Sequence, residues 1–257
     1  MRGAPRWIAT GQDFENCIGS SDPGISAMGR RIANAVYGNS AFALSGYLQA
    51  NYKSQFKNIV CEGDSVTFGY NVQMSYPAWL AYMLRDAGLQ KVTNVGISGS
   101  YMSTYNPPAI LDRAVANVDA LYDSDYQKNI AVLLTVNDLR HGPEHSIDED
   151  DVYGYIETWC LARKATGFEV VVLSLPAEYE VVGYEPHRDA LNIALRAGYT
   201  DFADALADVA LDPVIGINIG DPDSVAYDAR YYLDGVHLSS SGYYIMAEYV
   251  KNAILSL

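Results

Sequence analysis

The chain has 257 residues, a length that fits one large domain with an extension. Hydrophobic residues make up 49% of it and charged residues 19%, values typical of a chain that buries a sizeable core and not of a disordered one. The formal net charge of −14, with no basic stripe, argues against a nucleic acid partner, and no apolar run reaches the ~18 residues that a membrane-spanning helix needs.

The cysteines and the first residues indicate neither a disulfide framework nor a secretory signal. Cys17, Cys61 and Cys160 are far apart and odd in number, and the last two lie in apolar stretches that predict buried thiols. The N-terminus turns polar before any hydrophobic stretch forms. The compartment therefore stays open, since such a chain can remain inside a cell, leave by another route or be a trimmed form.

Residues 1–55 differ in composition from the rest of the chain. Residues 10–25 are loop-like, with Gly, Ser and Pro, and residues 25–52 are rich in Ala, Gly and Ser with scattered apolar positions. We interpret residues 1–55 as an N-terminal extension that packs on the main domain, residues 56–257, or on a partner. An oligomer can form through such an extension.

From residue 56 onward, strand patterns alternate with helix patterns. Strands are predicted at 58–61, 92–95, 130–134, 170–175 and within 203–209, and the continuous apolar run at 130–134 is typical of a strand buried on both faces. Helices are predicted at 76–88, 108–121, 148–165, 186–195 and 243–254. This alternation predicts an α/β fold with a parallel sheet between helices, whose ligand site lies beyond the carboxyl ends of the strands.

A candidate nucleophile follows the first strand directly. The sequence there is Gly63-Asp64-Ser65, and a serine hydroxyl is a poor nucleophile until a base removes its proton. The base can come from Asp234-Gly235-Val236-His237, because an aspartate three residues before a histidine on one loop can reach its Nδ1 and fix the tautomer.

Two more segments after strands offer neutral hydrogen-bond donors. Asn94-x-Gly96-x-x-Gly99 follows the second strand, and Thr135-Val136-Asn137-Asp138 follows the third. The backbone N–H of a glycine and the side-chain amide of an asparagine suit a developing oxyanion. Asp138 is interpreted as structural.

Taken in this order, the motifs resemble those of the SGNH (GDSL-type) hydrolase family, from Ile59 to His237 and through the helix that follows. The resemblance implies a three-layer α/β/α sandwich around a five-stranded parallel sheet, similar to flavodoxin. It also implies ester hydrolysis through an acyl-serine, with no metal or other cofactor. By position, Ser65 matches the nucleophile and one oxyanion donor, Gly99 and Asn137 match the other two donors, and Asp234 and His237 match the acid–base pair.

One position departs from the family pattern, and several neighbours are expected to line the substrate cleft. Thr135 stands where the third motif usually begins with glycine, and a β-branched residue can change the turn that orients the asparagine. The expected cleft residues are Asp64, Arg140, His141 and Tyr101.

Two patterns that suggest a metal are given other interpretations. His141 and His145 have the i, i+4 spacing of a metal pair, but Gly142-Pro143 interrupts any helix between them, so no metal is expected. The acidic run at 148–151 is interpreted as a helix N-terminus and not as a calcium loop.

The substrate is inferred from the aromatic residues near the predicted site. The chain has 21 tyrosines, and four of them (Tyr70, Tyr76, Tyr101 and Tyr105) fall in or near the loops after the first two strands, where they can stack on sugar rings. With no apolar lid visible, we favour acetyl or other short acyl esters, on a carbohydrate. The alternatives are a lysophospholipase or thioesterase-like acyl hydrolase, and a non-catalytic glycan-binding module on the same fold.

Overall fold

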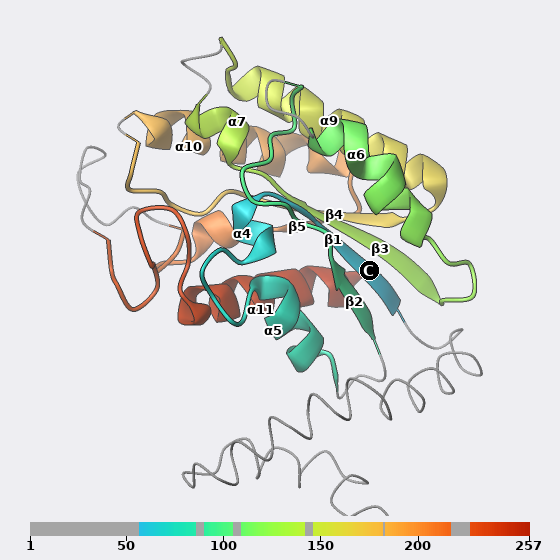
Figure 1. The fold of residues 1–257 in the computed structure, drawn as a ribbon. Coiled ribbons are helices and arrows are strands. Elements are labelled where there is room, and N and C mark those ends of the chain that lie inside the picture. The colour runs from blue at the N-terminus through green and yellow to red at the C-terminus, as the bar shows by residue number, and fades with distance from the viewer. Residues whose placement is uncertain (1–56, 86–89, 105–108, 142–145, 182, 217–226) are drawn as a thin grey trace, which may run out of the picture. The chain divides into compact units, whose positions relative to one another are not determined.

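The structure is a computed structural model that describes residues 57–85, 90–104, 109–141, 146–181, 183–216 and 227–257 (Figure 1). The predicted extension, residues 1–55, lies outside the described residues, and so do Cys17, Tyr105 and His145. The role proposed for the extension therefore stays a prediction.

The described chain is built on a five-stranded parallel sheet with the strand order β2-β1-β3-β4-β5. The strands are β1 (Lys57–Gly63), β2 (Lys91–Asn94), β3 (Lys128–Leu134), β4 (Glu169–Leu173) and β5 (Ala205–Ala207). The predicted sheet is confirmed. Its order reverses between β1 and β3, and in open α/β sheets ligands bind beyond the carboxyl ends of the strands at such a switch point.

Helices cover both faces of the sheet and complete three layers, as expected (Figure 1). One face carries α5 (Tyr76–Met83) and α11 (Ser240–Ser256), and the other carries α6 (Ile110–Asn117), α9 (Glu149–Thr166) and α10 (Tyr184–Gly198). Two one-turn helices follow β1 and β3, namely α4 (Ser65–Phe68) and α7 (Asn137–Arg140). Among the described residues, three 3-10 turns complete the elements: η5 (Asp119–Leu121), η6 (Tyr199–Asp201) and η7 (Val209–Leu211).

The two central strands are buried from their second residue onward, which explains their apolar sequences. The tripeptide Lys-Asn-Ile occurs in both, and the register places the two copies side by side. Asn58 Nδ2 donates to Asn129 Oδ1 at 2.8 Å and to the carbonyl oxygen of Leu121 at 2.7 Å. These contacts supply partners to polar groups that burial would otherwise leave unpaired.

Two helix predictions are refined by the structure. The helix expected over 108–121 is divided, because α6 ends at Asn117 and the separate 3-10 turn η5 follows. The acidic run at 148–151 begins α9, as predicted. Asp148 caps this helix by accepting from the backbone N–H groups of Asp150 and Asp151, and Asp151 accepts from the N–H of Asp148 in return.

Cys61 and Cys160 are both fully buried, which confirms the prediction for these two thiols.

Within the part of the chain that the structure describes, no helix combines the length and the apolar character needed to cross a membrane.

Candidate active site

Ser65, His237 and Asp234 form a continuous chain of hydrogen bonds. The Oγ of Ser65 lies 2.8 Å from His237 Nε2, and His237 Nδ1 lies 2.9 Å from Asp234 Oδ2. The hydroxyl can therefore donate to Nε2 while Nδ1 carries the proton that faces the carboxylate. This tautomer is the one in which Nε2 can accept the proton of Ser65. Sequence reasoning thus placed together three side chains that the fold does bring together.

The loop that carries Asp234 and His237 is held by its own backbone. Asp234 Oδ1 accepts from the N–H groups of Val236 at 2.9 Å and His237 at 2.6 Å, so the carboxylate binds both the ring and the main chain. The N–H of Leu233 donates to the carbonyl of His237 at 2.8 Å and closes the loop. Partial burial pushes the pKa of Asp234 up, but these hydrogen bonds outweigh it and hold the pKa below its usual value.

The buried side chain of Asp64 holds the turn before Ser65 in place. Its carboxylate accepts from the N–H of Val66 at 2.9 Å and from the N–H of Val136 at 2.7 Å. Burial raises its pKa to about 6, although both N–H bonds act in the opposite direction. Asp64 was expected to line the cleft, and this expectation is wrong, because the side chain is fully buried and ties α4 to the segment after β3.

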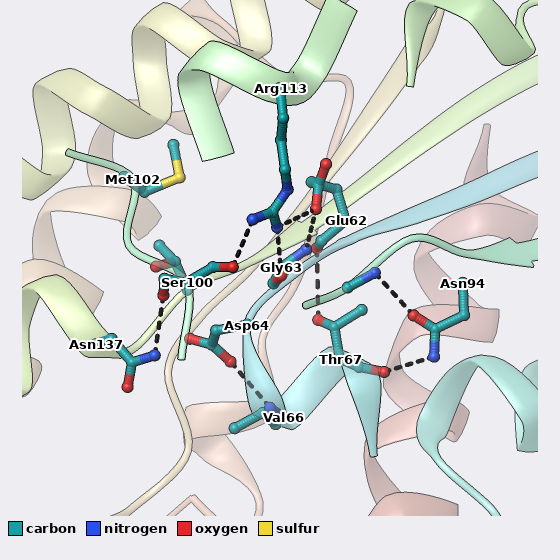
Figure 2. Close-up of polar contacts among 12 residues, drawn as sticks. Glu62, Gly63, Asp64, Val66, Thr67, Asn94, Ser100, Met102, Arg113 and Asn137 are labelled. Atoms are coloured by element: carbon teal, nitrogen blue, oxygen red, sulfur yellow. Dashed lines mark hydrogen bonds and ion pairs between the residues drawn. The ribbon is translucent and has the colours of Figure 1, made fainter. Parts of the chain in front are cut away.

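The segment that contains Gly99 is exposed, and it is fastened to the end of β1. The N–H of Ile97 donates to the carbonyl oxygen of Gly63 at 3.0 Å. Gly99 has a φ of +77°, a conformation that side-chain-bearing residues rarely adopt, which accounts for the glycine. Asn94, at the end of β2, donates to the carbonyl of Thr67 at 2.8 Å and accepts from the N–H of Gly96 at 3.0 Å (Figure 2).

Asn137 is the first residue of α7, and its amide nitrogen donates to the carbonyl oxygen of Ser100 at 2.9 Å. That bond uses one of the two amide hydrogens. Thr135, the departure from the family pattern, is buried and donates to Asp138 at 3.4 Å. The turn that carries Asn137 therefore forms with the Thr135 side chain buried.

Asp138 has the structural role that the sequence analysis expected. Its carboxylate accepts from the N–H groups of Met102 at 2.5 Å and Ser103 at 2.9 Å. These bonds fasten the segment after Gly99 to the start of α7.

The other expected cleft residues make two sets of contacts, one between Arg140 and two glutamates and one between Tyr101 and His141. The guanidinium of Arg140 contacts Glu178 at 3.1 Å and Glu180 at 2.5 Å, both in the segment after β4. Burial raises the pKa of Glu178 to about 7 even though Arg140 lowers it. The rings of Tyr101 and His141 have centroids 5.9 Å apart. Their contact with a substrate stays a prediction.

Of the tyrosines expected near the site, Tyr70 is both exposed and next to the base. Its ring centroid lies 4.6 Å from that of His237, and 39% of the residue is exposed. Tyr76 is fully buried, so the expectation that it could stack on a substrate is wrong.

A buried ion pair beneath the site was missed by sequence reasoning. Glu62 is fully buried at the end of β1, and Arg113 of α6 contacts it at 2.7 Å (Figure 2). Burial raises the pKa of Glu62, while the contact with Arg113 lowers it. No local pattern links residues 51 positions apart, and the only signal is a charged residue directly after the apolar run of the predicted strand at 58–61. Among the described residues, no three His, Cys, Asp or Glu side chains gather as a metal site would require.

Residues 61–245 match the family described as the GDSL-like Lipase/Acylhydrolase family. No curated protein sequence matches this chain. Among solved structures, a mutant of an acetyl-xylooligosaccharide esterase from Geobacillus stearothermophilus is similar, with a TM-score of 0.58 and 16% identity over 77% of this chain and 93% of that one.

Two further solved structures show the same fold. A GDSL-like lipase from Bacteroides thetaiotaomicron has a TM-score of 0.55 and 21% identity over 84% of this chain and 97% of its own. A member of the lipolytic G-D-S-L family from Veillonella parvula has a TM-score of 0.56 and 19% identity over 78% of this chain and 100% of its own.

Proposed function

The chain belongs to the GDSL-like lipase/acylhydrolase family and is a carboxylic ester hydrolase, and from this premise we propose that it removes acetyl or other short acyl groups from a carbohydrate. The observation that carries the mechanism is the hydrogen-bonded chain from Ser65 through His237 to Asp234. A module that only bound glycans would not need a base in contact with a buried serine hydroxyl.

In the proposed mechanism, Ser65 attacks the acyl carbon while His237 Nε2 takes the hydroxyl proton. The negative charge moves to the carbonyl oxygen, where the N–H groups of Ser65 and Gly99 and the amide of Asn137 stabilise it. Asp234 stabilises the imidazolium through Nδ1. When the tetrahedral intermediate collapses, the bond to the leaving alcohol breaks, and His237 gives that oxygen its proton.

The second half of the cycle restores the enzyme. His237 takes a proton from a water molecule as the water oxygen attacks the acyl carbon of the ester on Ser65. The second tetrahedral intermediate then releases the carboxylic acid, and the proton returns from Nε2 to Ser65 Oγ. No oxidant, metal or second substrate beyond water is needed for this balance.

Two observations support a carbohydrate as the alcohol component. A solved structure with the same fold comes from an enzyme that acts on acetyl-xylooligosaccharides. In this chain, the exposed ring of Tyr70 lies beside His237, and an aromatic face is a suitable surface for the apolar face of a sugar.

Exposed apolar side chains on the same segments support a second candidate, the hydrolysis of longer acyl esters or thioesters. Phe68 of α4 is 53% exposed, Ile97 is 39% exposed and Leu233 is 43% exposed. They stand close in sequence to Ser65, Gly99 and Asp234, so a longer acyl chain would find apolar contacts there.

The deciding experiment compares p-nitrophenyl acetate with p-nitrophenyl octanoate, for the wild type and Ser65→Ala. We expect turnover of acetate to exceed that of octanoate and to vanish in the variant. A preference for octanoate would favour the second candidate, and equal activity in the two proteins would rule out Ser65 as the nucleophile.

The sugar is tested by Tyr70→Ala on an acetylated xylooligosaccharide and on p-nitrophenyl acetate. If the ring stacks on the sugar, KM should rise for the oligosaccharide and change little for the small ester. Tyr82→Ala is the matched control, because Tyr82 is 46% exposed on α5 and has no contact with His237 among its ring contacts. An equal effect on both substrates would contradict the stacking role.

A further inference from the structure

One buried arginine contacts the ends of two segments that carry the proposed oxyanion donors. Arg113 is 7% exposed, and its side chain runs from α6 to the carboxyl end of β1 (Figure 2). Nη2 donates to Glu62 Oε1 at 2.7 Å and to the carbonyl oxygen of Gly63 at 2.9 Å. Nη1 donates to the hydroxyl of Ser100.

These bonds connect the three places from which an oxyanion would be held. Gly63 lies two residues before Ser65, and Ser100 directly follows Gly99. The carbonyl of Ser100 in turn accepts the amide of Asn137 at 2.9 Å. A shift of Arg113 would therefore reach the first two donors through one bond each and the third through Ser100.

The chemistry of the side chain suits this task. A guanidinium is planar and rigid, and its donors are directed along fixed lines, so one group can bind three acceptors at once in a set geometry. Glu62 fixes the guanidinium from the β1 side and neutralises its charge within the protein. Because a buried ion pair adds little net stability, a role in positioning explains this one better than a role in folding.

We propose that Arg113 is a positioning residue that sets the distances among the donors at Ser65, Gly99 and Asn137 without touching the substrate. This inference rests on the proposed function, because it assumes that these three groups hold the oxyanion. Donors that must meet a transition-state oxygen act within narrow limits, and a displacement of about 1 Å can cost roughly 100-fold in rate.

Arg113→Lys is the main test, since lysine keeps the charge opposite Glu62 but cannot donate to Gly63, Ser100 and Glu62 in the same plane. We expect kcat on p-nitrophenyl acetate to fall by about 10- to 100-fold with KM nearly unchanged. Arg163→Lys is the matched control, because Arg163 is also buried in an ion pair, with Asp119 at 2.6 Å, but joins α9 to η5. The control should lower Tm without lowering kcat.

A double-variant cycle separates positioning from a general loss of structure. If Arg113 acts through the oxyanion donors, Arg113→Lys should cost less in an Asn137→Ala background than in the wild type, because the part of its effect that reaches Asn137 through Ser100 is then already lost. Additive losses, or an unchanged kcat in folded Arg113→Lys, would overturn the inference.

Ser100→Ala decides the matter if Arg113→Lys does not fold, because it removes only the hydroxyl acceptor and leaves the carbonyl that binds Asn137. It should lower kcat by several-fold with Tm nearly kept, whereas an unchanged kcat would overturn the inference. Failure of the proposed function has a different signature: Ser65→Ala would then retain full activity, whatever these variants show.

Discussion

The segment that carries Ser65 and the loop that carries His237 are held in place by different kinds of contact. Around Ser65, buried polar groups from β1, α6 and the segment after β3 bind one another across long stretches of sequence. Around His237, the main contacts come from within the loop itself, between residues two to four positions apart. The loop is also more exposed, since the side chain of Asp234 is 47% accessible.

This difference predicts which substitutions should reduce activity most in each half of the site. Three oxyanion donors are proposed, and the same network of buried contacts holds the segments that carry them. Replacing one donor therefore leaves the other two in place. The acid–base loop has one base and no substitute for it. We therefore expect large effects from the base itself, intermediate effects from single donors and small effects from the contacts that dock the loop.

The largest loss of activity is expected from replacing the base, His237. His237→Ala should lower kcat by about 10⁴-fold or more, because no other group accepts the proton of Ser65. The measurement is the initial rate on p-nitrophenyl acetate. His187→Ala is the control, since that histidine pairs with Glu149 instead. A loss below tenfold would show that another group accepts the proton.

Removing one donor should cost less, because the two backbone donors remain. Asn137→Ala should lower kcat by about 10²–10³-fold with KM little changed. Asn129→Ala provides a matched control, as both asparagines are 5% exposed but Asn129 lies at the opposite end of β3. If both variants lost activity equally, the loss would reflect folding and not stabilisation of the oxyanion.

The docking of the loop is tested by Gly235→Ala. The carbonyl of Gly235 accepts from the N–H of Tyr179 at 2.8 Å, and an added Cβ would lie 3.0 Å from the backbone nitrogen of Glu180. We expect a loss of about 1–3 kcal/mol in the free energy of unfolding, measured by urea denaturation.

Gly154→Ala is the control for that loss, because the space for its Cβ is open on α9. This variant should be neutral or slightly more stable. Equal destabilisation by the two variants would mean that the close approach at Gly235 is unimportant.

The smallest effect concerns pH and the segment on which the loop docks. Because the pKa of Glu178 is raised by burial to about 7, the folded state holds its proton more tightly than the unfolded state. Its contribution to stability is therefore present below the unfolded pKa and is lost as the pH rises through the folded value.

Glu178→Gln removes this dependence. Its stability relative to the wild type should rise by about 1–2 kcal/mol between pH 5 and pH 8, as measured by thermal melts at both pH values. A difference between the two proteins that stayed constant with pH would refute the raised pKa.

The same difference explains how much the sequence could predict. The pairing of Asp234 with His237 is local, and its spacing is visible in the chain. The strands follow from apolar runs, and these runs place Ser65 and Asn137 directly after strands. The strand order, which makes those two strands neighbours at the switch point, comes from the structure alone. The burial of Asp64 and the bond between Arg113 and Ser100 depend on packing between distant segments, and no periodicity records such packing.

The bond between Ser65 and His237 joins residues 172 positions apart, and this separation has a consequence for synthesis on the ribosome. At about 5–20 residues per second, the serine leaves the ribosome roughly 9–34 s before the histidine that activates it. The growing chain therefore carries a dormant hydroxyl. It becomes an activated nucleophile only when His237 has emerged and its loop has folded against Ser65.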